Sequence, residues 1–454
     1  MKNALETAFQ AAMAHLDGLD HRPVDAIADA ATLRLRLAIQ LNDENIEPDR
    51  VIKDLVDAVD GGILGSASGR FFGWVIGGAL PAALAADWLA AAWDNNATLY
   101  ASGPAAAVVE EVAGAWLKDI LGLPQHASFA LVSGCQMAHV TSLAAARHAL
   151  LGKRGWDVEE RGLYGAPPIR IISSNQRHGS IDRAVRLLGF GSSHVTYLTD
   201  IAEFESALDT SIPTIVLLQA GDINTGHFDS FATLIPKAKQ AGAWVHIDAA
   251  FGLWAAASPR YRHLLRGADL ADSWATDGHK WLNTPFDCGY AFISDPASHR
   301  AAVSHRAAYL THAEDARDQI DWNPDWSRRA RGFSTYAALR QLGRKGVADL
   351  VDRCCAHARS IVMGISEMPG AELVSEPIIN QGMVRFLDPA GIDHDRRTDQ
   401  IIAAINRTGE AFFTGTTWKG RRAMRVSVCN WRTSQSDVER ALDCVKGVLK
   451  CRST

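Results

Sequence analysis

The chain has 454 residues, of which 47% are hydrophobic, and its 46 Lys and Arg against 51 Asp and Glu give a formal net charge of −5. This length suits a large domain together with a smaller one, and the apolar content supports a sizeable buried core rather than disorder. No long basic run occurs, so the composition excludes the clustered basic face of a nucleic-acid-binding protein.

The seven cysteines predict reduced thiols. Their number is odd and no CxxC pair occurs, which excludes a disulfide framework and a zinc ribbon, and we expect no metal site. The N-terminus has Lys2 and Glu6 but no apolar signal core. The expected location is therefore the cytoplasm.

The first part of the chain predicts a helical arm over residues 1–70. Ala, Leu and Ile recur at helical spacing through residues 26–41, with charges between them. Residues 61–78 are rich in glycine and predict a loop that crosses a surface or a site. The most apolar stretch, residues 71–93, is interrupted by Asp87 and Pro81, so we expect buried protein rather than a membrane span.

Residues 71–342 predict a large α/β domain, because short apolar runs alternate there with longer amphipathic ones. Several runs are apolar on both faces, which is typical of a buried, largely parallel sheet covered by helices. The expected strands are residues 128–132, 169–173, 194–198, 214–219, 244–248, 273–276 and 290–293. The expected crossover helices are residues 138–150, 181–188 and 231–241.

Residues 343–454 predict a smaller α+β domain. A helical pattern is followed by two short strand patterns, at residues 383–387 and 423–428, and by a closing helix over residues 436–449. No internal repeat or low-complexity tract occurs.

Lys280 has an unusual sequence context. It follows a predicted strand and a glycine turn, with apolar residues around it, in the run Thr276-Asp277-Gly278-His279-Lys280-Trp281-Leu282. Because lysines mostly lie on solvated faces, this context alone favours a surface residue.

Asp248 ends another apolar strand, in the run Trp244-Val245-His246-Ile247-Asp248. Ligands of open α/β sheets bind at the carboxyl ends of strands, and a buried carboxylate needs a positive or hydrogen-bonding partner. An N-cap of the next segment is the alternative interpretation. Taken together, however, Asp248 and Lys280 suit pyridoxal-phosphate (PLP) chemistry: the lysine amine forms an imine with the aldehyde, and the aspartate keeps the pyridine nitrogen protonated.

Two further turns offer cofactor contacts. The first is a strand, a glycine turn and a helix N-terminus, which is a natural phosphate seat, in the run Leu131-Val132-Ser133-Gly134-Cys135-Gln136-Met137-Ala138. The second contains His178, between a predicted strand and a helix, where an imidazole could stack on a planar ring. An ordinary turn histidine is the alternative.

The four motifs, around Gly134, His178, Asp248 and Lys280, occur in an order that is typical of one family. The chain resembles the group II PLP-dependent amino-acid decarboxylases, which include aromatic L-amino acid, glutamate and histidine decarboxylases. The resemblance runs from about residue 70 to residue 342 and, more loosely, into the C-terminal domain. Its most specific part is His246-Ile247-Asp248-Ala249-Ala250-Phe251-Gly252 followed by Asp277-Gly278-His279-Lys280-Trp281. The resemblance implies fold type I (aspartate-aminotransferase-like), with a PLP-binding large domain over residues 71–342 and a homodimer whose active sites lie at the subunit interface.

The same resemblance implies the roles of individual residues. Lys280, Asp248 and His178 would be catalytic, as the imine lysine, the pyridinium partner and the residue stacked on the ring. Ala250 would pack on the other face of the cofactor. The phosphate would be held by Gly134, Cys135, Gln136, Ser273 and His279.

Three departures from the family pattern stand out. Cys135 and Gln136 occupy a phosphate turn that often has small hydroxyl or glycine residues, although the Gln136 amide can donate. Residues 221–226 replace a run of threonines, which leaves Asn224 and Thr225 as unassigned candidates for the cofactor's 3-oxygen. Near Asp321, where the family has a tyrosine on a mobile loop, this chain has Trp322, and the nearest tyrosine is Tyr309.

The favoured reaction is α-decarboxylation of an L-amino acid to an amine and CO2. An aminotransferase or a lyase acting at Cβ remains open, because the same Asp and Lys serve those reactions. Oxidative deamination to an aldehyde is a further alternative, because the indole of Trp322 is not a practical acid. A catalytically silent PLP-fold scaffold is the non-enzyme alternative, and the retained Lys280 and Asp248 argue against it.

The resemblance also locates a substrate wall at residues 69–74. An apolar pocket of Phe71, Phe72, Trp74, Val75 and Ile76 would favour an aromatic or large aliphatic side chain over a dicarboxylic acid. A glutamate site would need a buried cation, which is absent from this stretch and would have to come from the other subunit.

Overall fold

The computed structural model describes residues 1–174, 176–198, 203–305 and 316–451. The chain divides into two compact units. The small unit comprises Met1–Ile76, His357–Glu376 and Gly382–Thr454, and the large unit comprises Gly77–Ala356 and Pro377–Gln381. The expected N-terminal arm and most of the expected C-terminal domain thus fall within one unit.

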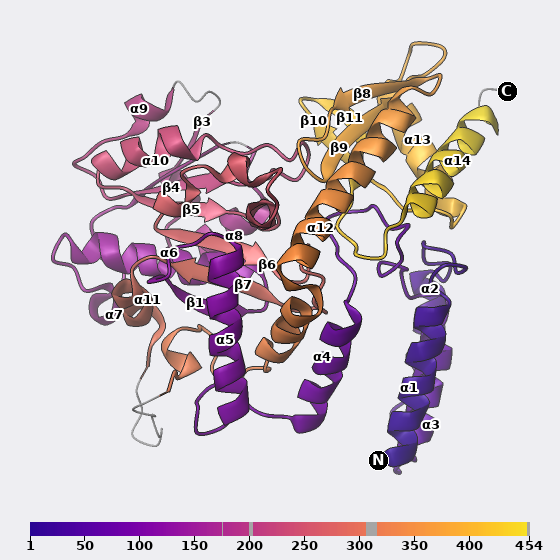
Figure 1. The fold of residues 1–454 in the computed structure, drawn as a ribbon, viewed down its shortest axis with the longest axis horizontal. Coiled ribbons are helices and arrows are strands. Elements are labelled where there is room, and N and C mark those ends of the chain that lie inside the picture. Colours follow the sequence, from indigo (N-terminus) through magenta and orange to yellow (C-terminus); the bar gives the residue numbers. More distant parts are fainter. Residues whose placement is uncertain (175, 199–202, 306–315, 452–454) are drawn as a thin grey trace. The chain divides into compact units, whose positions relative to one another are not determined.

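The large unit is built on a mixed sheet, which has seven strands among the described residues, in the order β1-β7-β6-β5-β4-β2-β3 (Figure 1). The strands are β1 (Ser128–Val132), β2 (Arg170–Ser174), β3 (Val195–Leu198), β4 (Thr214–Gln219), β5 (Trp244–Asp248), β6 (Ser273–Asp277) and β7 (Gly289–Ile293). Neighbours from β3 to β6 run parallel, whereas β7 is antiparallel to both β6 and β1. The short β6–β7 connection explains this reversal, because a parallel crossover needs a dozen or more residues.

Helices cover this sheet, and α6 is central among them because it packs on β1, β5, β6 and β7 and on α8 and α11. Its alanine-rich sequence lets it lie close to the sheet, with eleven of its described residues buried. The α-helices of the large unit are α4 (Pro81–Trp93), α5 (Pro104–Ile120), α6 (Cys135–Gly152), α7 (Val158–Arg161), α8 (Gly179–Leu187), α9 (Phe204–Ala207), α10 (Phe231–Gln240) and α11 (Pro296–Val303). Short 3-10 helices are η1 (Ser192–His194), η3 (Gly252–Ala257), η4 (Arg262–Leu265), η5 (Ala268–Leu270) and η6 (Gln319–Asp321).

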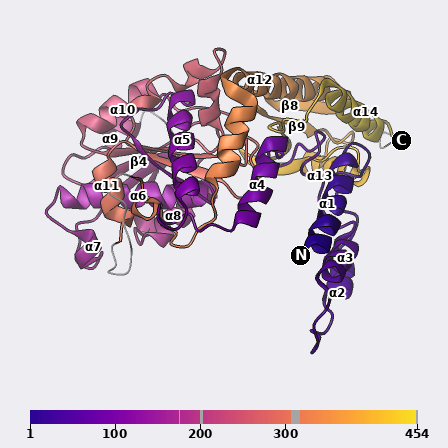
Figure 2. The ribbon, with the colours of Figure 1, turned by 60° about the horizontal axis from the view of Figure 1, so that its bottom comes forward.

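The small unit combines three N-terminal helices with an α+β layer. Its helices are α1 (Lys2–Asp17), α2 (Ala30–Leu37), α3 (Pro48–Val59), α13 (His394–Arg407) and α14 (Gln435–Cys451), and α12 (Gly332–Ser366) enters it from the large unit. Its strands are β8 (Ala371–Ser375), β9 (Gln381–Phe386), β10 (Thr414–Trp418) and β11 (Arg421–Ser427), ordered β10-β11-β9-β8. Helices α1 and α3 lie side by side (Figure 2), and no described residue of α1, α2 or α3 is buried.

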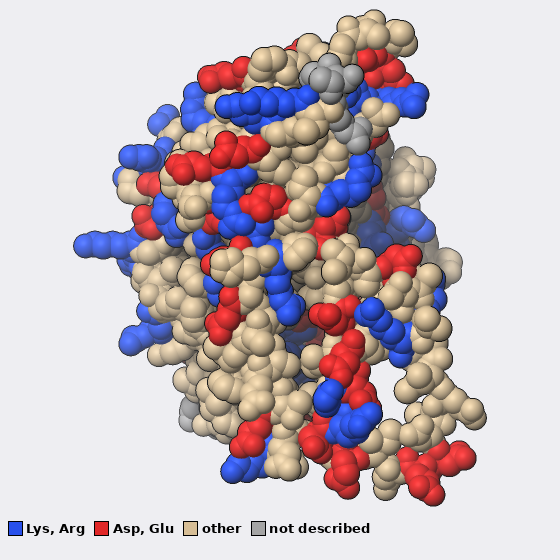
Figure 3. Space-filling model, turned by 90° about the vertical axis from the view of Figure 1, so that its right-hand side faces the viewer, with Lys and Arg blue, Asp and Glu red and all other residues tan. Residues whose placement is uncertain are grey.

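The apolar stretch at residues 71–93 becomes a turn followed by α4, which begins at Pro81. Among the described residues, none of the helices has both the length and the apolar character needed to cross a membrane. On the face drawn in Figure 3, basic and acidic side chains are interspersed.

Candidate active site

Lys280 lies just beyond the carboxyl end of β6, in a turn that closes against the chain at residue 77. A Cβ on Gly77 would lie 2.0 Å from the carbonyl oxygen of Lys280, so only glycine fits there. Asn283 holds the same turn, since its Oδ1 accepts the N–H of Gly78 (2.8 Å) and its Nδ2 donates to the carbonyl of Trp281 (2.9 Å). The glycine-rich loop predicted to cross a site therefore packs, at its end, on the backbone of Lys280.

The amine of Lys280 is paired with Asp277, whose Oδ2 lies 2.9 Å from Nζ. Burial lowers the pKa of Lys280, the Asp277 carboxylate raises it, and the balance is a pKa above the ordinary lysine value. Burial raises the pKa of Asp277, but Lys280 and His279 outweigh that effect, so this carboxyl stays ionised. Asp277 stands three residues before the lysine, but no motif in the sequence singled it out as a site residue.

Asp248 ends the neighbouring strand β5, in register with Ala275 of β6. The side chain is 5% exposed, and its Oδ1 accepts the N–H of Ala250 at 3.2 Å. Its Oδ2 has no hydrogen-bond partner among the described residues. A buried carboxylate oxygen without a partner is costly, so this atom suits a protonated ring nitrogen.

The turn into α6 has the features of a phosphate seat. The first turn of an α-helix offers N–H groups and the positive end of the helix dipole. His279 adds a donor, because its Nδ1 accepts the N–H of Cys288 (3.1 Å) and its Nε2 must then carry the proton of the neutral ring. Burial lowers the pKa of His279, which favours that neutral form. The ring lies against the turn, since a Cβ on Gly134 would be 3.1 Å from its Cε1.

Cys135 and Gln136 were expected to hold the phosphate. In the structure, both residues form hydrogen bonds to other parts of the protein instead. The backbone N–H of Cys135 donates to Asp277 Oδ1 (2.7 Å), and the Gln136 amide donates to the carbonyl of Ser180 (3.2 Å). The Gln136 side chain thus links α6 to α8. Any phosphate contact from Gln136 in this arrangement would have to come from its backbone.

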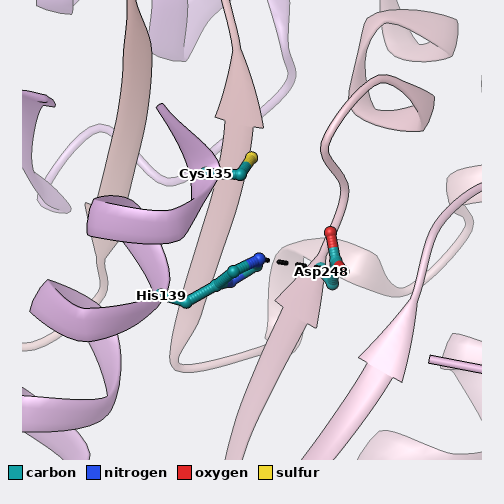
Figure 4. A group of neighbouring side chains, drawn as sticks. All are labelled: Cys135, His139 and Asp248. Atoms are coloured by element: carbon teal, nitrogen blue, oxygen red, sulfur yellow. Dashed lines mark ion pairs between the residues drawn. The ribbon is translucent and has the colours of Figure 1, made fainter. Parts of the chain in front are cut away.

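The side chains of Cys135, His139 and Asp248 converge behind the turn (Figure 4). One potential ligand atom from each lies within 4.8 Å of the others, and all three residues are buried. Metals bind the thiolate form of cysteine. Burial, reinforced by Asp277, raises the pKa of the Cys135 thiol well above its usual value, so the thiol carries its proton in the metal-free protein.

His178 and Ala250 lie on loops that follow strands of the large unit. His178 is the exposed N-cap of α8, and its Nδ1 accepts the N–H of Ser180 at 3.2 Å, so it has the capping role of a turn histidine in this structure. Ala250 is half-buried beside Asp248, and its carbonyl accepts the N–H of Asp277 at 2.9 Å. Stacking of His178 and packing of Ala250 on a cofactor remain predictions.

Ser273 does not lie where a phosphate contact requires. It is the first residue of β6, level with His246 and four residues before the carboxyl end of the strand. It is fully buried, and its hydroxyl is bonded to the side chains of Trp244 and His246. The expected phosphate contact by Ser273 is therefore wrong, because the strand places its side chain in the core.

The loop assignment around Trp322 also needs correction. Ile320 and Asp321 are buried in η6, and the ring of Trp322 packs edge-on against His299, with centroids 5.3 Å apart. His299 Nε2 also donates to the carbonyl of Trp322 at 2.8 Å. This segment is anchored to the protein and is not a free loop, while Tyr309 lies outside the described residues.

The expected substrate wall is largely core of the small unit. Phe71 is 2% exposed and stacks on Phe412 (5.0 Å between centroids), and Phe72 is 0% exposed and stacks on Phe413 (5.2 Å). These rings are already enclosed by packing within the unit, so they do not form an open wall. Trp74 is 46% exposed and remains available for contacts.

The Lys280 and Asp248 region fits PLP. The unpartnered Asp248 oxygen, the Lys280 amine and the α6 N-terminus with His279 offer one partner each for the ring nitrogen, the aldehyde and the phosphate. The carboxylate of Asp277 would disfavour a nearby phosphate, but Lys280 neutralises it in this structure.

Residues 32–387 match the model of the pyridoxal-dependent decarboxylase conserved domain. The chain is 26% identical to tryptophan decarboxylase 1 of Oryza sativa subsp. japonica over 437 residues, covering 88% of this chain and 84% of the relative. It is 23% identical to phenylacetaldehyde synthase of Arabidopsis thaliana, covering 87% and 84%. The crystal structure of Catharanthus roseus tryptophan decarboxylase in complex with L-tryptophan has the same fold, with a TM-score of 0.87, 20% identity and coverage of 99% and 98%. This confirms fold type I, and the chain belongs to the pyridoxal-dependent decarboxylases, as a PLP-dependent carboxy-lyase.

Proposed function

We propose that this enzyme decarboxylates an aromatic L-amino acid to the corresponding amine and CO2. The observation that carries the proposal is the pair Asp248 and Lys280 at the carboxyl ends of adjacent parallel strands, in a chain of the decarboxylase family. The relatives named above support the aromatic class, because their names refer to tryptophan and to phenylacetaldehyde.

Each of the site residues would have a separate role toward the cofactor. When bound, PLP supplies an electron sink for the charge left behind as CO2 departs. Asp248 would hold a proton on the ring nitrogen, since its Oδ2 is buried and without a partner among the described residues. His279 and the α6 N-terminus would hold the phosphate, while Lys280 provides the amine that carries the cofactor.

Asp277 controls the proton on that amine. Its carboxylate accepts from Nζ at 2.9 Å and stabilises the ammonium form. An amine must be neutral to attack an aldehyde, so Lys280 has to lose this proton before it binds PLP covalently. Whenever Nζ is not bound to the cofactor, Asp277 would hold it as an ammonium group.

A screen of amine release tests the substrate class. Tryptophan, tyrosine and phenylalanine should be turned over faster than leucine, glutamate and aspartate, with the Lys280→Ala variant as the blank. A rate for glutamate or aspartate that exceeds the aromatic substrates tenfold would reject the proposal. Transfer of the amino group to a keto acid, or loss of a Cβ substituent without CO2, would instead support the aminotransferase or lyase alternative.

A second candidate reaction is decarboxylation with oxidative deamination to an aldehyde. The similarity to a phenylacetaldehyde synthase favours it specifically. Amine, aldehyde, ammonia and hydrogen peroxide should be quantified together under air. Peroxide and aldehyde equal to the CO2 released would establish this reaction, and amine equal to CO2 would exclude it.

We also propose a homodimer, formed with the help of the N-terminal helices. Leu5, Leu35 and Leu55 are 62%, 84% and 50% exposed, and a second chain packed on these helices would bury that apolar surface. Sedimentation should give twice the chain mass of 49.1 kDa, and Leu35→Glu with Leu55→Glu should shift it toward one chain. The cytoplasmic location also remains a proposal, testable by fractionation of the source cells.

A further inference from the structure

A chain of four buried side chains leads from the core of the large unit to Asp248. Trp244 Nε1 donates to Ser273 Oγ (2.9 Å), Ser273 Oγ is 2.9 Å from His246 Nδ1, and His246 Nε2 is 2.9 Å from His139 Nδ1. His139 Nε2 then lies 3.7 Å from Asp248 Oδ2.

Secondary structure aligns these groups. Trp244, His246 and Asp248 alternate along β5, so their side chains point to the same face of the sheet. Ser273 stands level with His246 on β6, and His139 is one turn beyond Cys135 on α6, which packs on that face. His139, His246 and Ser273 are 0% exposed, which isolates the chain from solvent.

Hydrogen-bond chemistry gives this chain a direction. An indole N–H can only donate, so Ser273 Oγ accepts from Trp244. The hydroxyl hydrogen of Ser273 then needs an acceptor, and His246 Nδ1 is the one found for it among the described residues. His246 must therefore carry its proton on Nε2 and donate to His139 Nδ1, which leaves the proton of His139 on Nε2, facing Asp248.

The protonation states agree with this direction. Burial lowers the pKa of His139 and lowers that of His246 well below its usual value, so both rings are neutral and each carries a single proton. At the end of the chain, His139 Nε2 and Asp248 Oδ2 are both buried and both without a partner among the described residues. Asp248 Oδ2 can accept from His139 Nε2 and also from the pyridine nitrogen, because a carboxylate oxygen accepts more than one hydrogen bond.

We infer that Ser273, His246 and His139 are positioning residues that direct one N–H toward the Asp248 carboxylate, orienting it for the pyridine nitrogen of PLP. A neutral N–H donor stabilises the carboxylate form without adding a positive charge that would compete with the pyridinium. The inference rests on the proposed role of Asp248. It adds three residues to the site, none of which contacts the cofactor in this role.

Position 139 offers the first matched test. His139→Gln keeps an N–H donor at a similar distance from the backbone, whereas His139→Met has similar length and no donor. The readouts are the NMR shift of the isotope-labelled pyridine nitrogen of PLP and the Kd for PLP. Wild type and His139→Gln should show the protonated nitrogen, while His139→Met should shift toward the unprotonated value and bind PLP about tenfold more weakly, because the carboxylate would lose the N–H that faces it at 3.7 Å.

A second pair of variants, at Ser273 and Trp244, tests the direction of the hydrogen bonds between the four side chains. Ser273→Ala removes the donor to His246 Nδ1 and leaves either tautomer of His246 available, so it should resemble His139→Met at the pyridine nitrogen. Trp244→Phe leaves the Ser273 donor in place and should resemble wild type there. Introducing Ser273→Ala into the Trp244→Phe variant avoids a buried indole N–H without a partner, and this pair carries the test if the position-139 variants do not fold.

The outcomes separate this inference from the proposed function. A protonated nitrogen and a Kd within twofold of wild type in His139→Met would overturn the inference, as would equal losses in His139→Gln and His139→Met. Asp248→Asn serves as the reference. If Asp248→Asn leaves the pyridine nitrogen protonated, the role of Asp248 itself is wrong. If Asp248→Asn removes that proton but His139→Met does not, only the positioning roles of His139, His246 and Ser273 are rejected.

Discussion

Lys280 Nζ lies 2.9 Å from Asp277 Oδ2, and this ion pair joins the turn after β6 to the buried last residue of that strand. Asp277→Asn should lower the pKa of Lys280, because burial would act without the opposing carboxylate. Each unit by which the pKa falls raises the neutral amine fraction about tenfold at a pH well below it. PLP should therefore be incorporated into the apoprotein faster than in wild type, which stopped-flow absorbance measures. Asn retains an oxygen for the Cys135 N–H, and an unchanged rate would mean that Asp277 does not control the amine.

Lys280 should be the residue that carries the cofactor covalently. Borohydride reduction of the holoenzyme followed by peptide mapping should place the pyridoxyl group on Lys280. In Lys280→Ala, PLP should bind only as the free aldehyde, because the position has no amine. Labelling of another lysine in the wild type would disprove the assignment.

Asp248→Asn should fold normally and lose most turnover. An amide cannot keep the pyridine nitrogen charged, and removing a key electrostatic group of this kind costs roughly 3–4 kcal/mol of barrier. The measurement is turnover at saturating PLP, with the unfolding midpoint as a check of the fold. Near-normal turnover would remove Asp248 from this role.

Gly77→Ala should destabilise the turn that presents Lys280. Its Cβ would lie 2.0 Å from the Lys280 carbonyl oxygen, and overpacking of this kind costs about 1–3 kcal/mol. Denaturant unfolding should show this loss, together with weaker PLP binding. Gly152→Ala is the matched control, because nothing lies within 4 Å of the added Cβ, and it should leave both quantities near wild type.

His299 should make stability depend on pH. Burial, with the charge of Arg317, lowers its pKa from 6.5 to about 3, so the folded state keeps it neutral while the unfolded chain takes up a proton. The contribution is fully present above pH 6.5 and is lost as pH falls toward 3. As the pH falls over this range, the unfolding free energy of His299→Gln should decrease less steeply than that of wild type. The two slopes should differ by up to about 1.4 kcal/mol per pH unit. Equal slopes for the two proteins would show that His299 does not titrate on unfolding.

Much of the large sheet was predictable from the pattern of apolar residues. The expected bounds of residues 128–132, 214–219 and 244–248 agree with β1, β4 and β5, because strands buried on both faces read as short continuous apolar runs. Strands β8 and β10 were missed. They lie at the two edges of the smaller sheet, contain no fully buried residue, and so lack that apolar signal.

By itself, the sequence determined the α/β class, the family and the pair Asp248 and Lys280, because PLP chemistry requires those residue types within short local motifs. Only the tertiary structure decided the surroundings of the pair. The register of β5 and β6 places Ser273 in the core, where it bonds to His246 and not to the phosphate. The packing of α6 places His139 beside Asp248. These contacts join residues far apart in the chain. They depend on strand register and on which face a helix turns to the sheet, and a local pattern of residues does not encode either.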